Sequence, residues 1–170
     1  MDVKICEDRR ALHQIPELDR NLPETFAYLN GVLSRLNCRV FAPVTGSLCA
    51  FFDFGKQNSI SFRADADALP ITENTGAGYA SRHPGCMHAC GHDGHTAMLL
   101  GTAKILQEYA DELPTDILLI FQPAEEGPGL GGAVKMVPQI QNTGLADKIV
   151  AAFGQHVSND YPAGFVALKK

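Results

Sequence analysis

The chain has 170 residues, of which 45% are hydrophobic and 19% charged, a composition that fits one globular domain and argues against a wholly disordered protein. Lys and Arg number 14 against 19 Asp and Glu, giving a net charge of −5. This acidic balance argues against nucleic acid or an anionic membrane surface as the main partner. No stretch approaches about 18 consecutive apolar residues. The N-terminus, MDVKICEDRR, lacks the apolar core of a secretory signal, so we expect a cytoplasmic protein without a membrane span.

Apolar side chains at helical spacing predict two helices in the first part of the chain. The first runs from residue 1 to about residue 14. The second follows Asn21, which we expect to cap it, and has Pro23 in its first turn and apolar positions as far as Leu36. Three β-like runs separated by glycine-containing turns come next, at residues 38–42, 48–54 and 59–63.

The second half of the chain alternates helices with apolar runs of strand length. A broad apolar stripe predicts a well-covered helix over residues 93–109. ILLIF, at residues 117–121, is typical of an interior parallel strand, and IVAAF, at residues 149–153, predicts another. Between them, residues 132–141 favour a helix that Pro138 interrupts. Strands alternating with helices indicate an α/β fold, in which ligands gather beyond the carboxyl ends of the strands.

The densest cluster of chemically active side chains is MHACGHDGH, residues 87–95, which holds three of the six histidines. Thiolate and imidazole are good ligands for zinc and related ions, and Cys90 and His92 are separated by a single glycine that permits unusual backbone angles. The spacing favours metal binding over the alternative, a helix N-terminus whose polar residues merely cap it. We expect His88 and His95 to support the site rather than to be ligands.

Two adjacent carboxylates, Glu125 and Glu126, follow ILLIF and Pro123. Alone, this segment would be read as a solvated acidic loop. Beside a metal, one carboxylate can be a ligand while its neighbour takes a proton from the attacking water, which would explain the pair.

Two further features follow predicted strands. Asp65 and Asp67 lie in FRADADALP, where they can orient ligands or merely form a turn. His156 comes just after IVAAF, and its position after a predicted strand makes it a candidate metal ligand. A lone histidine is otherwise more often a structural residue.

Several segments, in order along the chain, resemble the M20 metallopeptidase family. The closest branch is that of the amidohydrolases acting on N-acyl amino acids, hippurate and indole-acetyl amino acids. The matching segments are RRALHQIPEL (9–18), FRADADALPI (62–71), MHACGHDGHTAMLLG (87–101), FQPAEEGPG (121–129) and FGQHV (153–157).

This resemblance implies a site for two divalent ions, with zinc expected and manganese, cobalt or nickel as alternatives. Glu125 matches the general base, and Asp65 matches an acid beside the site, so we group both as catalytic candidates. The thiolate of Cys90 is implied to contact both ions. The residues that match metal ligands are Cys90, His92, Glu126 and His156.

The resemblance also implies a three-layer α/β/α catalytic domain with a mostly parallel mixed sheet. Family members are about twice as long, so we expect residues 1–170 to be part of the catalytic domain. The inserted lid and dimerisation domain, and the returning segment with a further histidine ligand, would then be absent. An exposed sheet edge or apolar face would make a homo-oligomer plausible.

The resulting hypothesis is metal-dependent hydrolysis of the amide bond of an N-acyl amino acid, with activity impaired by the missing part. Three alternatives stay open. The chain could bind metal without turnover, it could be a dipeptidase or carboxypeptidase of the same superfamily, or Cys90 could act as a nucleophile with a histidine base.

Overall fold

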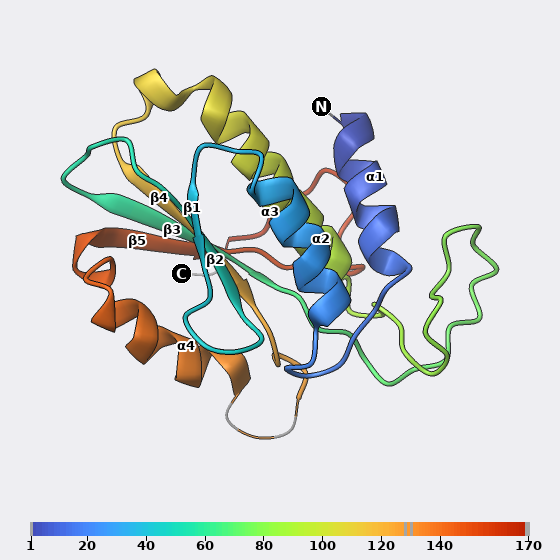
Figure 1. The fold of residues 1–170 in the computed structure, drawn as a ribbon. Helices are drawn as coiled ribbons and strands as arrows, with labels where there is room; N and C mark the ends of the chain where they lie inside the picture. The colour runs from blue at the N-terminus through green and yellow to red at the C-terminus, as the bar shows by residue number, and fades with distance from the viewer. Residues whose placement is uncertain (1, 128, 130, 169–170) are drawn as a thin grey trace.

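The computed structural model describes residues 2–127, 129 and 131–168 (Figure 1). Four helices are present in this part of the chain: α1 (Asp2–His13), α2 (Pro23–Leu33), α3 (His92–Glu108) and α4 (Gly131–Asn142). None of these helices is both long and apolar enough to cross a bilayer. The strands are β1 (Arg39–Phe41), β2 (Leu48–Phe52), β3 (Ser59–Asp65), β4 (Asp116–Gln122) and β5 (Ile149–Gly154), and the 3₁₀ turns are η1 (Ala110–Glu112) and η2 (Ala146–Lys148).

The strands form one mixed sheet in the order β1-β2-β4-β3-β5. Strand β2 pairs antiparallel with β1 and with β4, whereas β3 pairs parallel with β4 and with β5. The expected mixed sheet is therefore confirmed, although its pairings are evenly divided rather than mostly parallel. Because β3, β4 and β5 run in the same direction, their carboxyl ends meet at one edge of the sheet.

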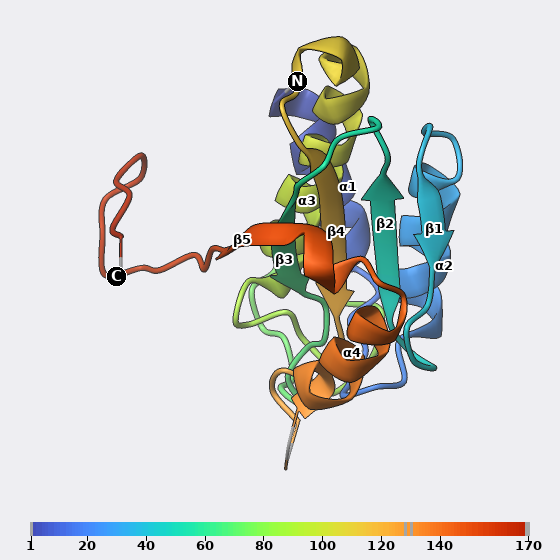
Figure 2. The ribbon, with the colours of Figure 1, turned by 90° about the vertical axis from the view of Figure 1, so that its left-hand side faces the viewer.

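Helices cover both faces of the sheet, which confirms the three-layer α/β/α architecture. Figures 1 and 2 show α1, α2 and α3 on one face and α4 on the other. Successive side chains of β4 point to opposite faces, so Leu119 joins the core under the first three helices while Leu118 packs with Met136 and Ile140 of α4. Burial on both faces explains why β4 is continuously apolar.

The start of α2 differs from the prediction. Its N-cap residue is Leu22 rather than Asn21, and the side chain of Leu22 makes no capping hydrogen bond. The buried carboxylate of Glu17 takes over the capping role, accepting the backbone N–H groups of Glu24 at 3.1 Å and Thr25 at 2.8 Å. The cap therefore comes from the preceding turn and not from the residue next to the helix.

Two other elements also differ from the sequence-based expectation. Helix α4 continues through Pro138, because Pro138 lies on the exposed face, where water can bond the carbonyl that the proline leaves free. Strand β5 is an edge strand of the described sheet rather than an interior one, since it pairs only with β3. Its Val150 is 62% exposed and its Phe153 53% exposed. An apolar run alone does not distinguish a covered strand from an uncovered one.

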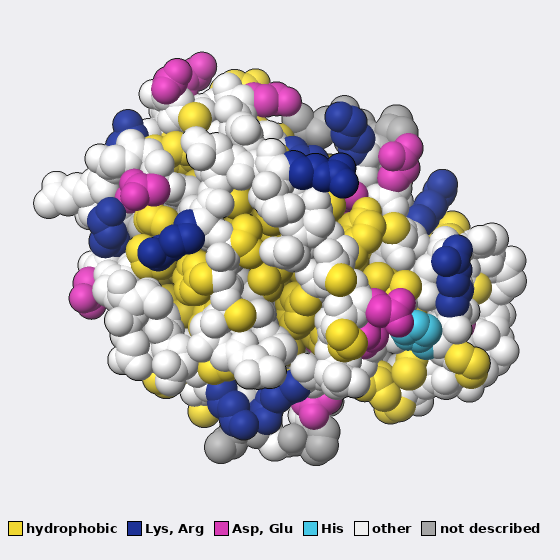
Figure 3. Space-filling model, in the orientation of Figure 1, with side chains coloured by type: hydrophobic (Ala, Val, Ile, Leu, Met, Phe, Trp, Pro, Cys, Tyr) yellow, Lys and Arg dark blue, Asp and Glu magenta, His cyan; other side chains and the backbone are white. Residues whose placement is uncertain are grey.

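The molecular surface carries both signs of charge. Figure 3 shows Lys and Arg side chains spread over one face and interspersed with Asp and Glu, with apolar side chains reaching the surface between them. After β5, the chain crosses the N-terminal end of α3 and then extends away from the body (Figure 2).

Candidate metal centre

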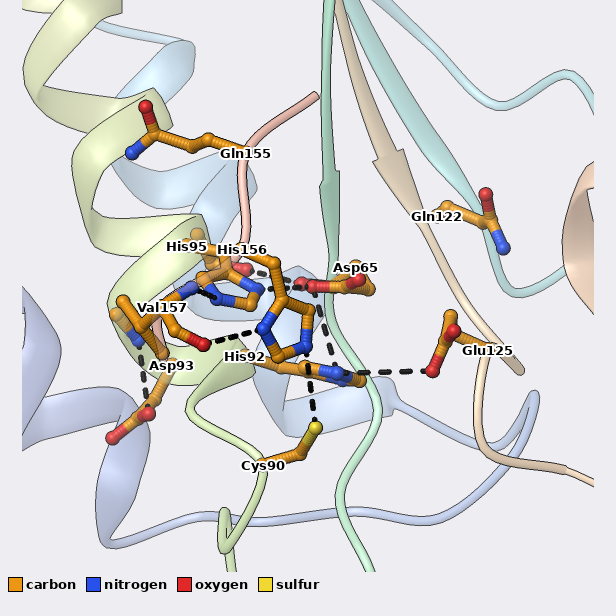
Figure 4. Close-up of polar contacts among 12 residues, drawn as sticks. Asp65, Cys90, His92, Asp93, His95, Gln122, Glu125, Gln155, His156 and Val157 are labelled. Carbon is orange, nitrogen blue, oxygen red and sulfur yellow. Dashed lines mark hydrogen bonds and ion pairs between the residues drawn. The ribbon is translucent and has the colours of Figure 1, made fainter. Parts of the chain in front are cut away.

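The candidate residues meet at the edge where the parallel strands end, opposite the N-terminus of α3 (Figure 4). Gly91 caps α3 with a φ of 91°, a left-handed conformation that glycine adopts without strain. This turn separates Cys90, which precedes the helix, from His92, its first residue. The other candidates come from strand ends: Asp65 closes β3, Glu125 and Glu126 follow β4, and His156 follows β5.

His92 is the central side chain of the site and is only 1% exposed. Its Nδ1 lies 2.8 Å from the carbonyl oxygen of Asp67, so Nδ1–H is the donor and Nε2 keeps its lone pair. That Nε2 atom has no hydrogen-bond partner among the described residues. A buried acceptor without a donor is costly, and a bound cation would satisfy it.

The surroundings of this nitrogen fit a cation. Carboxylate oxygens of Asp65 and Glu126 lie 3.7 Å from Nε2 of His92, and one of Glu125 lies 3.8 Å away. A lone pair and several carboxylate oxygens within one small space repel each other unless a positive charge lies between them. The side chains present therefore fit a divalent ion, and the mixture of sulfur, nitrogen and oxygen donors suits zinc and its first-row neighbours.

Cys90 and His156 form the second pair of the site. The Sγ of Cys90 lies 3.4 Å from Nε2 of His156, whose Nδ1–H donates to the Val157 carbonyl at 2.6 Å. Burial, followed by the hydrogen bond and negative charge of Glu126, raises the pKa of the Cys90 thiol to about 12. A thiol surrounded by acids is a poor nucleophile, whereas a bound cation would favour its ionisation.

Asp65 is an ionised acid with defined partners. One oxygen accepts a hydrogen bond from Nδ1 of His95 at 2.6 Å, and the other accepts from Arg63 at 2.8 Å. Burial opposes ionisation, but the His95 hydrogen bond, the neighbouring His92 ring and the Arg63 guanidinium outweigh it and lower the Asp65 pKa to about 2. Asp65 thus supplies a negative charge beside His92.

Asp67 fixes the loop that carries the two glutamates. Its fully buried carboxylate accepts the backbone N–H groups of Glu125 and Glu126, each at 2.9 Å. The loop enters this arrangement through Ala124, whose φ of 54° is unusual for a residue with a side chain. Burial raises the pKa of Asp67, although the two backbone donors oppose this effect.

A polar network between α1 and the first turn of α3 was not predicted from residue spacing. Asp93 forms an ion pair with Nε of Arg9 at 2.8 Å and accepts a hydrogen bond from Nδ1 of His13 at 2.7 Å, and Nε2 of His13 lies 3.3 Å from Glu73. The spacing of Arg9 and His13, four residues apart on α1, was the available signal. A cavity of about 760 Å³ runs from this network to Cys90 and His156.

The structure brings all six predicted site residues together: Asp65, Cys90, His92, Glu125, Glu126 and His156. Their individual roles remain predictions. His95 lies within the same cluster, as a partner of Asp65. His88 is buried without a hydrogen-bond partner among the described residues, and its burial lowers its pKa to about 4, so its ring is neutral near neutral pH.

Comparisons with known proteins agree with this geometry. The chain is 45% identical over 163 residues to the N-acetyl-L-cysteine deacetylase of Bacillus subtilis (strain 168), covering 95% of this chain and 38% of the relative. It is 39% identical over 177 residues to thermostable carboxypeptidase 1 of Saccharolobus solfataricus, covering 99% of this chain and 44% of the relative. The chain therefore spans less than half the length of these curated relatives.

A solved structure has the same fold. The YXEP protein of Bacillus subtilis, described as a dinuclear metal-binding peptidase of the M20 family, superposes with a TM-score of 0.86 at 33% identity, covering 99% of this chain and 46% of that one. The model of peptidase family M20/M25/M40 matches residues 61–169, which include the whole candidate site and more than half of the chain. The chain belongs to the peptidase family M20/M25/M40.

Proposed function

We propose that this chain forms the metal-binding part of a hydrolase that cleaves the amide bond of N-acyl amino acids. The observation that carries the proposal is the buried Nε2 of His92, which finds no hydrogen-bond partner in the described part of the chain and lies among carboxylates of Asp65, Glu125 and Glu126. The named activity of the Bacillus subtilis relative, deacetylation of an N-acetylated amino acid, supports this substrate class.

The ligand set proposed for two divalent ions is Cys90, His92, Glu126 and His156, which come from the N-terminal end of α3 and from the ends of strands β4 and β5. Ions held there would polarise the scissile carbonyl and lower the pKa of water. Asp65 adds negative charge next to His92. Zinc is the first candidate because a thiolate and imidazoles contribute, and manganese, cobalt and nickel are the others.

Glu125 is the proposed general base. Its side chain is less buried than that of Glu126, with 40% against 23% exposed, so it faces the open side of the site. There its carboxylate takes the proton of the attacking water and then delivers it to the leaving amine. The Asp67 carboxylate accepts the backbone N–H of Glu125. This bond keeps the Glu125 carboxylate in position as it gains and then loses the proton.

The test combines metal analysis with hydrolysis. Metal-loaded protein is incubated with hippurate, N-acetyl amino acids and dipeptides, and bound metal per chain is measured in parallel. Glu125→Gln should retain metal and lose hydrolysis by about 10²-fold or more, whereas Glu126→Gln should lose metal. Glu112→Gln, at an exposed position, is the matched control. Undiminished hydrolysis in Glu125→Gln would refute the proposed base.

Metal binding without turnover is the second candidate function. It is favoured by the exposed position of His156, one of the proposed ligands, at the rim of the site. Stoichiometric metal with no hydrolysis of any compound in the panel would support it. Faster hydrolysis of dipeptides than of N-acetyl amino acids would instead favour a peptidase, the activity named for the Saccharolobus relative.

We also propose self-association through β5. The outer edge of this strand is unpaired among the described residues, and its Val150 and Phe153 are exposed. Sedimentation of the wild-type chain and of Val150→Lys tests this proposal, since the charged variant should shift the population toward monomer.

A further inference from the structure

The segment Gln155–Val157, which carries His156, lies across the N-terminal end of α3 (Figure 4). Two hydrogen bonds join it to the helix within the described residues. The Val157 N–H donates to Nε2 of His95 at 2.9 Å, and Nε2 of Gln155 lies 2.8 Å from the Met98 sulfur. These two hydrogen bonds, together with the packing of the Val157 side chain against Gly91, determine where His156 lies.

His95 contacts partners on both sides of its ring, and it is 2% exposed. Since the Val157 N–H is a donor, Nε2 of His95 must hold a lone pair, and the proton must lie on Nδ1. That Nδ1–H donates to Asp65 at 2.6 Å. The tautomer and the orientation of the His95 ring are therefore fixed by one partner from β3 and one from the segment after β5.

The β3 side of this arrangement is rigid. Arg63 holds the other oxygen of Asp65 at 2.8 Å, and the Thr96 hydroxyl donates to the Asp65 carbonyl at 2.9 Å, which ties the start of α3 to the end of β3. A side chain held in this way can fix the position of a more mobile partner.

On the other side, the position of His156 follows from that of Val157. The rings of His95 and His156 meet edge to face with centroids 4.5 Å apart, and Nε2 of His156 then lies 3.4 Å from Sγ of Cys90. Within the described residues, the other hydrogen bond of the His156 ring is to the adjacent Val157 carbonyl, which moves with the segment.

We propose that His95 is a positioning residue which, by accepting the Val157 N–H, places His156 beside Cys90 and so completes the metal site. The inference rests on the metal binding proposed above and extends it to a residue that is not itself a ligand. The decisive contact for the position of His156 is one hydrogen bond, from the backbone N–H of Val157 to Nε2 of His95.

Two substitutions separate the two bonds of His95. Asn at this position can still donate to Asp65 but is too short to reach Val157, whereas Gln can accept the Val157 N–H but not donate to Asp65. Titration with Co²⁺ should show that His95→Asn binds the ion about 10–100-fold more weakly, because removing a residue that orients a metal ligand typically has an effect of this size. His95→Gln should restore most of the affinity. His83→Gln, which affects a ring bonded to the Pro16 carbonyl, is the matched control.

The absorption spectrum of bound Co²⁺ is a readout that a general loss of stability would not change. In His95→Asn, the thiolate-to-cobalt band from Cys90 should persist, while the ligand-field bands shift because the imidazole of His156 no longer binds. Val157→Pro removes the N–H donor from the other side and should reproduce both effects even if His95→Asn fails to fold. Val166→Pro, at a position that is 79% exposed, should leave both the affinity and the spectrum unchanged.

The outcomes distinguish this inference from the proposed function. Wild-type affinity and spectrum in either His95→Asn or Val157→Pro, with normal binding by the wild type, would overturn the role of His95 and leave the metal site intact. Absence of Co²⁺ binding by the wild-type chain would overturn both.

Discussion

The carbonyl oxygen of Asp67 lies 2.8 Å from Nδ1 of His92 and thereby determines which nitrogen of that ring faces the candidate metal site. The carboxylate of the same residue holds the backbone of Glu125 and Glu126. One buried residue thus orients an imidazole through its main chain and a loop with two acids through its side chain.

Asp67→Asn should weaken both the loop and metal binding. An amide presents one oxygen and one NH₂ group, so one of the two backbone N–H donors loses its acceptor and faces another donor. We expect unfolding by urea to show a loss of about 1–3 kcal/mol. Zinc affinity should fall by about 10–100-fold.

The matched control for this change is Asp53→Asn, because the exposed Asp53 also accepts a backbone N–H, that of Gly55 at 2.9 Å, but lies in a surface turn. Its stability should change by less than about 0.5 kcal/mol. Equal effects of the two substitutions would contradict the role assigned to Asp67.

Gly91→Ala should displace the segment that carries His156. A Cβ at this position would lie 2.5 Å from Cγ2 of Val157, and the φ of +91° adds backbone strain of about 1–2 kcal/mol. Gly85→Ala, at a φ of +79° with open space around it, isolates the strain. Urea unfolding and metal titration should therefore show a larger loss for Gly91→Ala than for Gly85→Ala.

A double substitution tests the steric part of this argument. Val157→Ala removes the methyl group that the new Cβ would meet. Gly91→Ala combined with Val157→Ala should therefore lose no more stability and metal affinity than Gly85→Ala does. If the two substitutions are simply additive, the proposed contact does not determine the effect.

The α/β alternation and the clusters of candidate site residues could be recognised in the sequence because both signals are local. The apolar run of β4 and the acids directly after it indicate an interior strand with a functional loop at its carboxyl end. The cluster around Cys90 and His92 has a donor density that solvated loops do not show. Each of these patterns lies within about ten consecutive residues, where spacing is informative.

The contacts that hold the site together could not be predicted in the same way. The hydrogen bond between Val157 and His95 joins residues 62 positions apart, and its donor is a backbone group common to nearly every residue type. The carboxylate of Glu17 caps α2 from 8 positions before Thr25, so no local pattern identified it in preference to Asn21. Such partners are determined by tertiary packing and not by spacing.

Asp116 provides a test of acid sensitivity away from the site. Its buried carboxylate accepts the N–H groups of Phe54 and Lys56 and pairs with Lys148 at 2.8 Å. Burial opposes ionisation, but the Lys148 bond and the two backbone donors outweigh it and lower the pKa of Asp116. A pKa that is lower in the folded state means that stability is present above the unfolded pKa and is lost as the pH falls through the folded value.

Asp116→Asn should therefore cost about 1–3 kcal/mol at neutral pH, and the difference from wild type should shrink progressively as the pH falls below about 4. Urea unfolding at a series of pH values measures this convergence. Asp147→Asn, at an exposed position, should follow the wild-type curve at every pH. A penalty for Asp116→Asn that is constant down to pH 2 would contradict an ionised, paired carboxylate.

Removal of divalent ions distinguishes the metal mechanism from nucleophilic attack by Cys90. A ligand that binds only the folded state at 100 times its Kd stabilises it by about 2.7 kcal/mol, so chelator treatment should lower the Tm and addition of zinc should restore it. His92→Gln should abolish this response, because the replacement cannot supply the buried Nε2, whereas His83→Gln should retain it. Any hydrolysis should fall and recover in parallel with the Tm. Hydrolysis that survives chelation and is lost in Cys90→Ser would instead assign the reaction to the thiol, against the raised pKa of Cys90.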